Sequence, residues 1–160
     1  MKVLVLGMGN PILSDDGVGL IVAERLKGTI DGVQVETSPL IGLNLLDSII
    51  GYDTLFIVDA MTTGGTIGRV RKLTSQDRHG TLHLFSSHGM DIFELMEFGS
   101  CSGLHMPKLG GIYGIEIGRE VAFGEELSPV LTEQLDTIIE TIRRDIERSL
   151  EPLNPEQEQA

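Results

Sequence analysis

The stretch VLVLGMGNPILSDDGVGLIVAERL, residues 3–26, decides the fold class. A short apolar run, Val3–Leu6, leads into a glycine-containing turn, and after the turn apolar side chains recur at helical spacing from Val18 to Leu26. This order predicts a buried strand, a turn, and a helix that ends at Gly28. Strand, turn and helix in this sequence form the repeating unit of α/β proteins with a parallel sheet.

The same alternation of short apolar runs and longer amphipathic runs continues along the chain. We expect an α/β three-layer sandwich: a mostly parallel, twisted sheet of about five strands with helices on both faces, and room for one antiparallel edge strand. Residues 67–73 are the candidate edge strand. The other expected strands are 33–36, 55–58, 82–85 and 110–117, and the other expected helices are 43–50, the region of 92–96, and a long final helix from Ser128 to Leu150.

Length and composition limit the classes of protein to which the chain can belong. The 160 residues, 41% of them hydrophobic, suit one globular domain, which we place at 1–150, followed by a flexible acidic tail at 151–160. Twelve Lys and Arg against 24 Asp and Glu give a net charge of −12, which argues against nucleic acid as a partner. No apolar run approaches the roughly 18 residues of a membrane span. The single cysteine, Cys101, and the lack of a signal peptide predict a cytoplasmic protein, and we expect a monomer.

The first turn suits a cation better than a nucleotide. Gly7 and Gly9 begin a dinucleotide-binding pattern, but Ile12 stands where the third glycine would be, and Pro11 removes an N–H that could face a phosphate. The adjacent acids Asp15 and Asp16 would repel a pyrophosphate and attract a metal ion. We expect Asp15 to cap the helix that follows and Asp16 to be free for function.

Two further polar residues follow predicted strands. Asp59 ends the strand 55–58, and His88 follows the strand 82–85. If these strands run parallel to the first one, Asp16, Asp59 and His88 converge at the carboxyl edge of the sheet, as an open three-ligand metal site. The alternative for Asp59 is a structural turn that caps Gly64 and Gly65.

The remaining histidines and the cysteine give weaker signals. His79 and His83 are four residues apart, but Gly80 interrupts any helix that would align them, so we expect both on the surface. Cys101 and His105 could form a nucleophile or a soft metal site, although an ordinary loop is the favoured interpretation.

Five short motifs follow one another along nearly the whole chain. They are Gly7-Met8-Gly9-Asn10 with Asp15-Asp16-Gly17-Val18-Gly19, Ile57-Val58-Asp59-Ala60, Ser87-His88, Gly114-Ile115-Glu116 and Leu127-Ser128-Pro129. In this order they resemble the nickel-iron hydrogenase maturation endopeptidases. The resemblance implies an aspartyl-type endopeptidase that removes a C-terminal extension from the nickel-loaded precursor of the hydrogenase large subunit.

The resemblance also implies roles for individual residues. Asp16, Asp59 and His88 would be both the catalytic and the metal-binding positions, and the nickel would be carried by the precursor rather than held permanently. The metal could then be a checkpoint, because a nickel-free precursor lacks the cation that the two acids require. It could also polarise the scissile carbonyl or activate a water.

Other interpretations of the same residues stay open. A nickel-binding hydrogenase assembly factor without peptidase activity would use the same three ligands, and a nucleotide-dependent oxidoreductase would use Gly7, Gly9 and Glu36. Thr37-Ser38-Pro39-Leu40 stands where the family resemblance leads us to expect a Gly-Gly-Thr type loop. The Met-rich segment 89–107 could contact the precursor, or could be a helix packed on the sheet.

Overall fold

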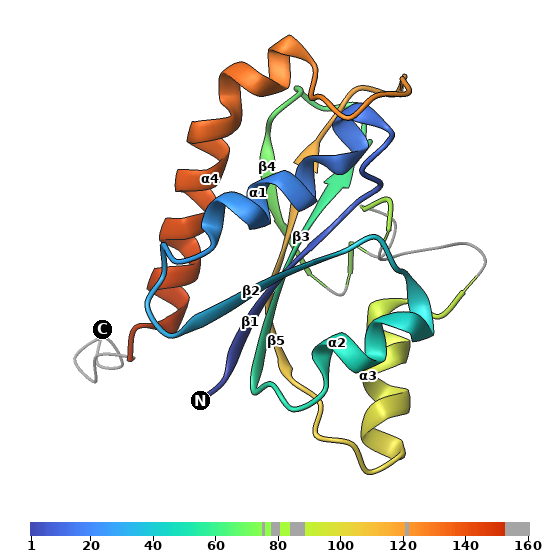
Figure 1. The fold of residues 1–160 in the computed structure, drawn as a ribbon. Helices are drawn as coiled ribbons and strands as arrows, with labels where there is room; N and C mark the ends of the chain where they lie inside the picture. The colour runs from blue at the N-terminus through green and yellow to red at the C-terminus, as the bar shows by residue number, and fades with distance from the viewer. Residues whose placement is uncertain (75, 78–80, 84–88, 121, 153–160) are drawn as a thin grey trace.

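The central sheet of the protein has four parallel strands and one antiparallel strand. The structure is a computed structural model, and it describes residues 1–74, 76–77, 81–83, 89–120 and 122–152. The strand order is β2-β1-β3-β5-β4 (Figure 1). Neighbouring strands are parallel except for β4, which runs antiparallel to β5 at the edge. The strands are β1 (Val3–Met8), β2 (Val33–Ser38), β3 (Thr54–Met61), β4 (Val70–Leu73) and β5 (Lys108–Glu116).

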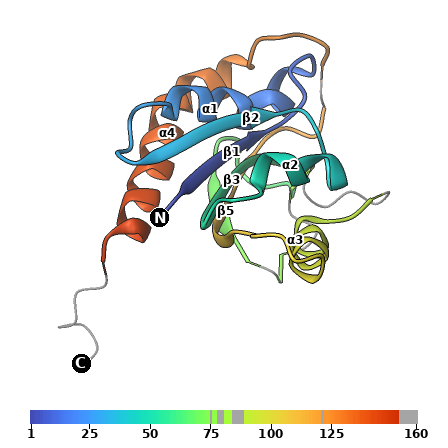
Figure 2. The ribbon, with the colours of Figure 1, turned by 60° about the horizontal axis from the view of Figure 1, so that its bottom comes forward.

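Helices cover both faces of this sheet and complete three layers (Figures 1 and 2). One face carries α1 (Val18–Leu26) and α4 (Pro129–Leu150), and the other carries α2 (Leu46–Ile49) and α3 (Ile92–Cys101). Two short 3-10 segments, η1 (Ser14–Gly17) and η2 (Gly42–Leu45), lead into α1 and α2. The expected three-layer α/β sandwich and its antiparallel edge strand are therefore confirmed.

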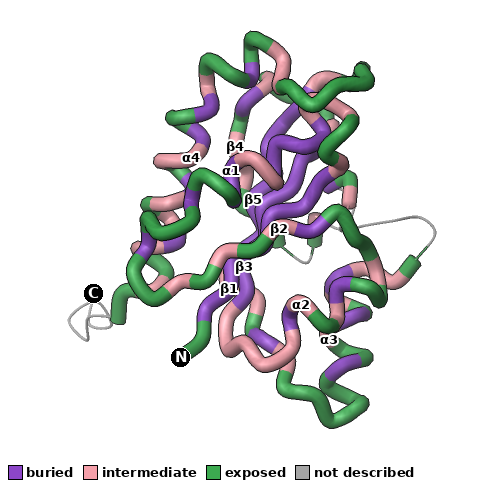
Figure 3. The backbone as a smooth tube through the Cα atoms, viewed as in Figure 1, coloured by how far each residue is buried: buried purple, intermediate pink, exposed green. Residues whose placement is uncertain are grey.

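The core consists of two apolar clusters separated by the sheet. Successive side chains of β1 point to opposite faces, so Val3 and Val5 pack with α1 and α4, while Leu4 and Leu6 pack with α2 and α3. Every residue of β1 is buried, and Figure 3 shows buried backbone along the central strands. A strand buried on both faces needs a continuous apolar run, which explains the sequence of β1.

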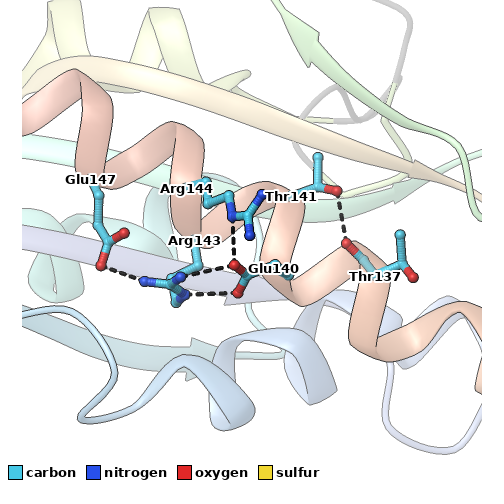
Figure 4. A network of polar contacts seen from close by, with 6 residues as sticks. All are labelled: Thr137, Glu140, Thr141, Arg143, Arg144 and Glu147. Atoms are coloured by element: carbon cyan, nitrogen blue, oxygen red, sulfur yellow. Dashed lines mark hydrogen bonds and ion pairs between the residues drawn. The ribbon is translucent and has the colours of Figure 1, made fainter.

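The long helix α4 is amphipathic, as its sequence predicts. The Ser128 hydroxyl caps it by accepting from the Leu131 N–H, and Pro129 occupies its first position. On its outer side Glu140 accepts from both Arg143 and Arg144 (Figure 4), and these hydrogen bonds lower the pKa of Glu140 to about 2. No helix in the described part of the chain is both long and apolar enough to cross a membrane.

The prediction of a strand at 82–85 is wrong for Leu82 and His83, the two residues of this range that the structure describes. Leu82 and His83 lie in a turn, and residues 84 and 85 are outside the described part of the chain. Thr81 forms a single antiparallel bridge with Met61, and the Leu82 N–H donates to the Ala60 carbonyl at 3.0 Å. The segment thus crosses the end of β3 instead of extending the sheet.

Candidate active site

Asp16 lies in η1, within the turn that follows the carboxyl end of β1, and it is only 5% exposed. Its Oδ2 accepts a hydrogen bond from the Asn10 N–H at 3.2 Å. This bond closes the turn around Pro11 and points the carboxylate toward the sheet edge rather than into solvent.

The same turn contains a strained backbone position. Ser14 has a φ of +49°, which side-chain-bearing residues rarely adopt and which costs about 1–3 kcal/mol. The chain before α4 holds Ser14 in place: the Ser14 N–H donates to the Gly124 carbonyl at 2.7 Å, and its hydroxyl donates to the Glu126 carbonyl at 2.6 Å. The conformation that presents Asp16 is therefore built by contacts between distant parts of the sequence.

Asp15 does not have the capping role that the sequence predicts, because neither η1 nor α1 has a side-chain cap. Its Oδ1 instead accepts from the Ser128 N–H at 2.7 Å, at the start of α4. Asp15 is thus a structural residue, as expected, but it stabilises a different helix. Asp16 takes no part in this contact, and its functional role stays a prediction.

Asp59 is fully buried near the end of β3. Its Oδ1 accepts from the Ala60 N–H at 2.9 Å, and its Oδ2 accepts from the His83 N–H at 2.9 Å. Asp59 is not the cap of Gly64 and Gly65, because the buried carboxylate of Glu116 accepts from both of their N–H groups. The structural alternative for Asp59 is therefore wrong.

His83 joins the two acids. Its Nδ1 lies 2.7 Å from Asp59 Oδ1 and its Nε2 lies 3.0 Å from Asp16 Oδ2. Burial alone would lower the pKa of His83, but the hydrogen bonds and negative charges of Asp16 and Asp59 outweigh burial and raise the pKa to about 10. The ring is therefore an imidazolium at neutral pH, placed between two carboxylates.

The expectation that His83 lies on the surface is wrong, since its side chain is only 16% exposed. The sequence offers no local signal for its position, because the alternation of Leu82 and His83 suggests a strand and the two residues lie in a turn. The acids that hold the ring are contributed by two other strand ends, so local spacing could not reveal the contact.

The structure brings together Asp16 and Asp59, as predicted. His88, the third predicted ligand, lies outside the described residues, as does His79. Within the described part of the chain, no group of three or more His, Cys, Asp or Glu side chains is arranged to hold a metal ion. The predicted metal set of Asp16, Asp59 and His88 therefore stays a prediction.

The glycines of the first turn are needed for packing. A Cβ on Gly7 would collide with Ala23 and with the Gly19 carbonyl, and a Cβ on Gly19 would collide with the carbonyls of Met8 and Val58. These residues let α1 lie against β1 and β3 at very short range. Gly9 is needed for the same reason, since a Cβ there would lie 2.6 Å from the Asp16 carbonyl oxygen, so packing accounts for both glycines of the Gly-x-Gly pattern.

Cys101 and His105 lie away from the acid pair. Cys101 is exposed and unpaired, and the His105 ring contacts Asp53 at 3.0 Å, close to the start of β3 and so at the amino edge of the sheet. The expected loop is observed for His105, whereas Cys101 is the last residue of α3.

Comparison with known proteins gives consistent matches. The family model described as hydrogenase maturation protease (HycI) matches residues 24–145, a range that includes Asp59 and His88 and begins after Asp16. The hydrogenase 2 maturation protease of Escherichia coli (strain K12) is 33% identical over 66 residues, which are 39% of this chain and 40% of that protein. The match thus spans less than half the length of this curated relative.

Solved structures share the fold over almost the whole chain. The hydrogenase maturating endopeptidase HybD from E. coli superimposes with a TM-score of 0.74 at 22% identity, covering 94% of each chain. The NiFe hydrogenase maturation protease HycI from Thermococcus kodakarensis KOD1 superimposes with a TM-score of 0.66 at 24% identity, covering 91% of this chain and 92% of that one. At these identities the matches concern the fold.

Proposed function

The chain belongs to the hydrogenase maturation protease family, and from this premise we propose that it is an endopeptidase that removes the C-terminal extension from the nickel-loaded precursor of the NiFe hydrogenase large subunit. In this proposal Asp16, Asp59 and His88 engage the nickel of the precursor. The observation that carries the proposal is the pair of buried carboxylates, Asp16 and Asp59, at the carboxyl edge of the sheet.

Because both carboxylates are buried, the acid pair favours binding of a cation. A carboxylate taken out of water is costly unless a positive charge or several hydrogen bonds compensate it. Asp59 is completely buried and Asp16 nearly so, and the one positive side chain that contacts both among the described residues is His83. A precursor that carries nickel supplies a divalent cation, whereas an unloaded precursor does not.

The donor types also suit nickel. Divalent nickel binds imidazole nitrogens and accepts oxygen ligands, and an incomplete protein ligand set leaves positions for the ligands of the precursor. In the proposal the nickel acts as the recognition element, and a water cleaves the peptide bond. The acid pair also supplies carboxylates that can accept a proton from that water.

The direct test uses precursor in two forms, loaded with nickel and free of nickel. We expect the wild-type protein to shorten only the loaded form, which mass spectrometry detects as loss of the C-terminal extension. Equal cleavage of both forms would refute the checkpoint, and no cleavage of the loaded form would refute the peptidase. Binding of the loaded form without shortening would instead identify an assembly factor.

Site variants identify the residues that take part. We expect Asp16→Asn, Asp59→Asn and His88→Ala each to reduce the rate of processing by at least about 100-fold, because each removes a group that meets the nickel. Two matched controls come from the opposite edge of the sheet: Asp53→Asn and His105→Ala change the same residue types, in an exposed pair. A site variant that processes at the control rate would remove that residue from the proposed site.

A further inference from the structure

The contact between His83 and the two acids has a geometry of its own. Opposite nitrogens of one ring point at different carboxylates, at 2.7 Å and 3.0 Å. Carboxylate oxygens only accept hydrogen bonds, so both ring nitrogens donate. The ring therefore provides two charge-assisted hydrogen bonds and occupies the space between Asp16 and Asp59.

In this arrangement the two acids cannot share a metal ion through the same oxygens. Carboxylate oxygens bind a divalent ion such as zinc at about 2.0–2.2 Å. The ring lies between the two oxygens and contacts one with each nitrogen, so a single ion cannot reach both oxygens at that bond length while the ring is in place.

We propose that His83 is a positioning residue that takes the place of a cation between Asp16 and Asp59 before the precursor binds, and that the nickel of the precursor displaces its ring. This inference rests on the proposed function, because it assumes that the acid pair engages nickel. It assigns to His83 a role opposite to that of a ligand: its ring competes with the metal.

The backbone around His83 permits such a displacement. The His83 N–H donates to Asp59 Oδ2 and the Leu82 N–H donates to the Ala60 carbonyl, so the main chain stays attached to β3 whichever way the ring points. The ring is 16% exposed, whereas Asp59 is fully buried. A rotation of the side chain toward solvent would therefore free the acids without moving the strand that carries Asp59.

The experiment measures the affinity of the full-length protein for aqueous Ni²⁺ at one fixed pH by isothermal titration calorimetry. We expect His83→Ala to bind Ni²⁺ at least about tenfold more tightly than the wild type, because no ring has to be displaced. His83→Gln, whose neutral amide cannot replace both charged hydrogen bonds, is the second variant and should bind more tightly in the same direction. His105→Ala, which removes the ring of the exposed His–Asp pair, should bind as the wild type does.

A second measurement separates competition from a purely structural role. Loss of a merely structural contact lowers both stability and metal affinity, whereas competition predicts lower stability without metal together with higher affinity. Thermal unfolding with and without Ni²⁺ shows this as a larger stabilisation by the metal in the two His83 variants than in the wild type.

The outcomes are distinct. Weaker binding by both His83 variants would make His83 a ligand and overturn the proposal, and equal affinity or no measurable binding by any of the proteins would overturn it as well. The gain should disappear when Asp16→Asn is added to His83→Ala, and a gain that persisted would place the ion elsewhere. The proposed function fails separately, in the processing assay, if the wild type cleaves nickel-free precursor.

Discussion

The neighbouring acids Asp15 and Asp16 make contacts with different parts of the chain. Asp16 turns toward the sheet edge and contacts His83, while Asp15 accepts from the Ser128 N–H, 113 residues away in the sequence. The second contact satisfies a backbone donor at the N-terminus of α4 and places a negative charge near the positive end of that helix. Asp15 therefore stabilises the start of α4, while Asp16 is held at the carboxyl edge of the sheet.

The contact of Asp15 predicts an effect on stability. We expect Asp15→Ala to lower the free energy of unfolding by about 1–3 kcal/mol, because it leaves the Ser128 N–H without its charged acceptor. Asp15→Asn, which keeps an acceptor oxygen, should lose less. Urea unfolding followed by circular dichroism measures both, with the exposed Asp31→Ala as the matched control. An Asp15→Ala midpoint equal to that of the control would contradict the role.

The sequence allows the prediction of the two acids, because each follows a buried strand and parallel strands end at the same edge. His83 could not be found in this way. Its position depends on simultaneous contacts with Asp16 and Asp59, which come from other strand ends, and a ring that neutralises two buried charges has no local signature. The strained conformation of Ser14 is similarly set by Gly124 and Glu126.

At the scale of elements, α4 is fastened to the sheet by a polar contact as well as by its apolar face. Asp145 accepts from Lys72 of β4 at 2.8 Å and from the Tyr113 hydroxyl of β5 at 2.7 Å. Burial alone would raise the pKa of Asp145, but the hydrogen bonds from Lys72 and Tyr113 outweigh burial and lower it. The contact therefore ties the edge strand, its neighbour and the helix together.

The lowered pKa gives a pH dependence with a defined sign. An acid whose pKa is lower in the folded state stabilises the fold at pH values above its unfolded pKa, and this contribution disappears as the pH falls through the folded value. We expect Asp145→Asn to cost about 1 kcal/mol at pH 7, a small effect because the side chain is 35% exposed, and to cost progressively less as the pH falls below the ordinary pKa of an aspartate. Unfolding measured from pH 2 to pH 7 tests this.

The control for that series is another acid on the same helix. Asp136 pairs with Arg25, but its side chain is 88% exposed, so Asp136→Asn should leave the stability and its pH dependence nearly unchanged. Equal losses of stability in Asp145→Asn and Asp136→Asn across the pH range would contradict the role of the Asp145 contact. Such losses would instead be due to the change in the net charge of α4.

The elements themselves differ in how well their sequences predict them. Helical spacing and a buried face predict α1 over Val18–Leu26 and the start of α4 at Ser128, because these signals are local. The run at 82–85 looks like a strand by composition, yet Thr81 makes only one bridge and the chain turns at Leu82 and His83. Hydrogen bonding to the end of β3 overrides the local preference for a strand.

At the scale of the whole molecule, exposed apolar side chains gather in the segments that follow the carboxyl ends of the strands. Ile12 follows β1, Leu40, Ile41 and Leu43 follow β2, and Phe123 follows β5, while Leu82 stands next to His83. One side of α3 packs on the sheet through Ile92 and Leu95, as the structural interpretation of the segment 89–107 predicts, although Phe98 of the same helix is exposed. We refer to the six exposed residues as the edge patch.

Leu82 of the edge patch directly precedes His83, so under the proposed function we expect the peptide of the precursor to dock on this patch. The segment after β2 is also where the sequence departs from the expected Gly-Gly-Thr type loop. Apolar side chains at this position favour a substrate segment that is itself apolar next to the nickel site. We therefore expect the edge patch to determine the affinity for the precursor, and the acid pair to determine the rate of cleavage.

Leu43 and Leu104 provide a matched pair to test this. Leu43 is 54% exposed and belongs to the edge patch, whereas Leu104 is 36% exposed and lies near the start of β5, at the opposite edge of the sheet. Burying a leucine against a partner is worth about 1.5 kcal/mol or more, so Leu43→Ser should raise KM for the loaded precursor about tenfold and leave kcat nearly unchanged. Leu104→Ser should leave both constants unchanged, and because neither side chain is in the core, both variants should unfold within about 0.5 kcal/mol of the wild type. An equal rise of KM in the two variants would mean that the precursor does not dock on the edge patch.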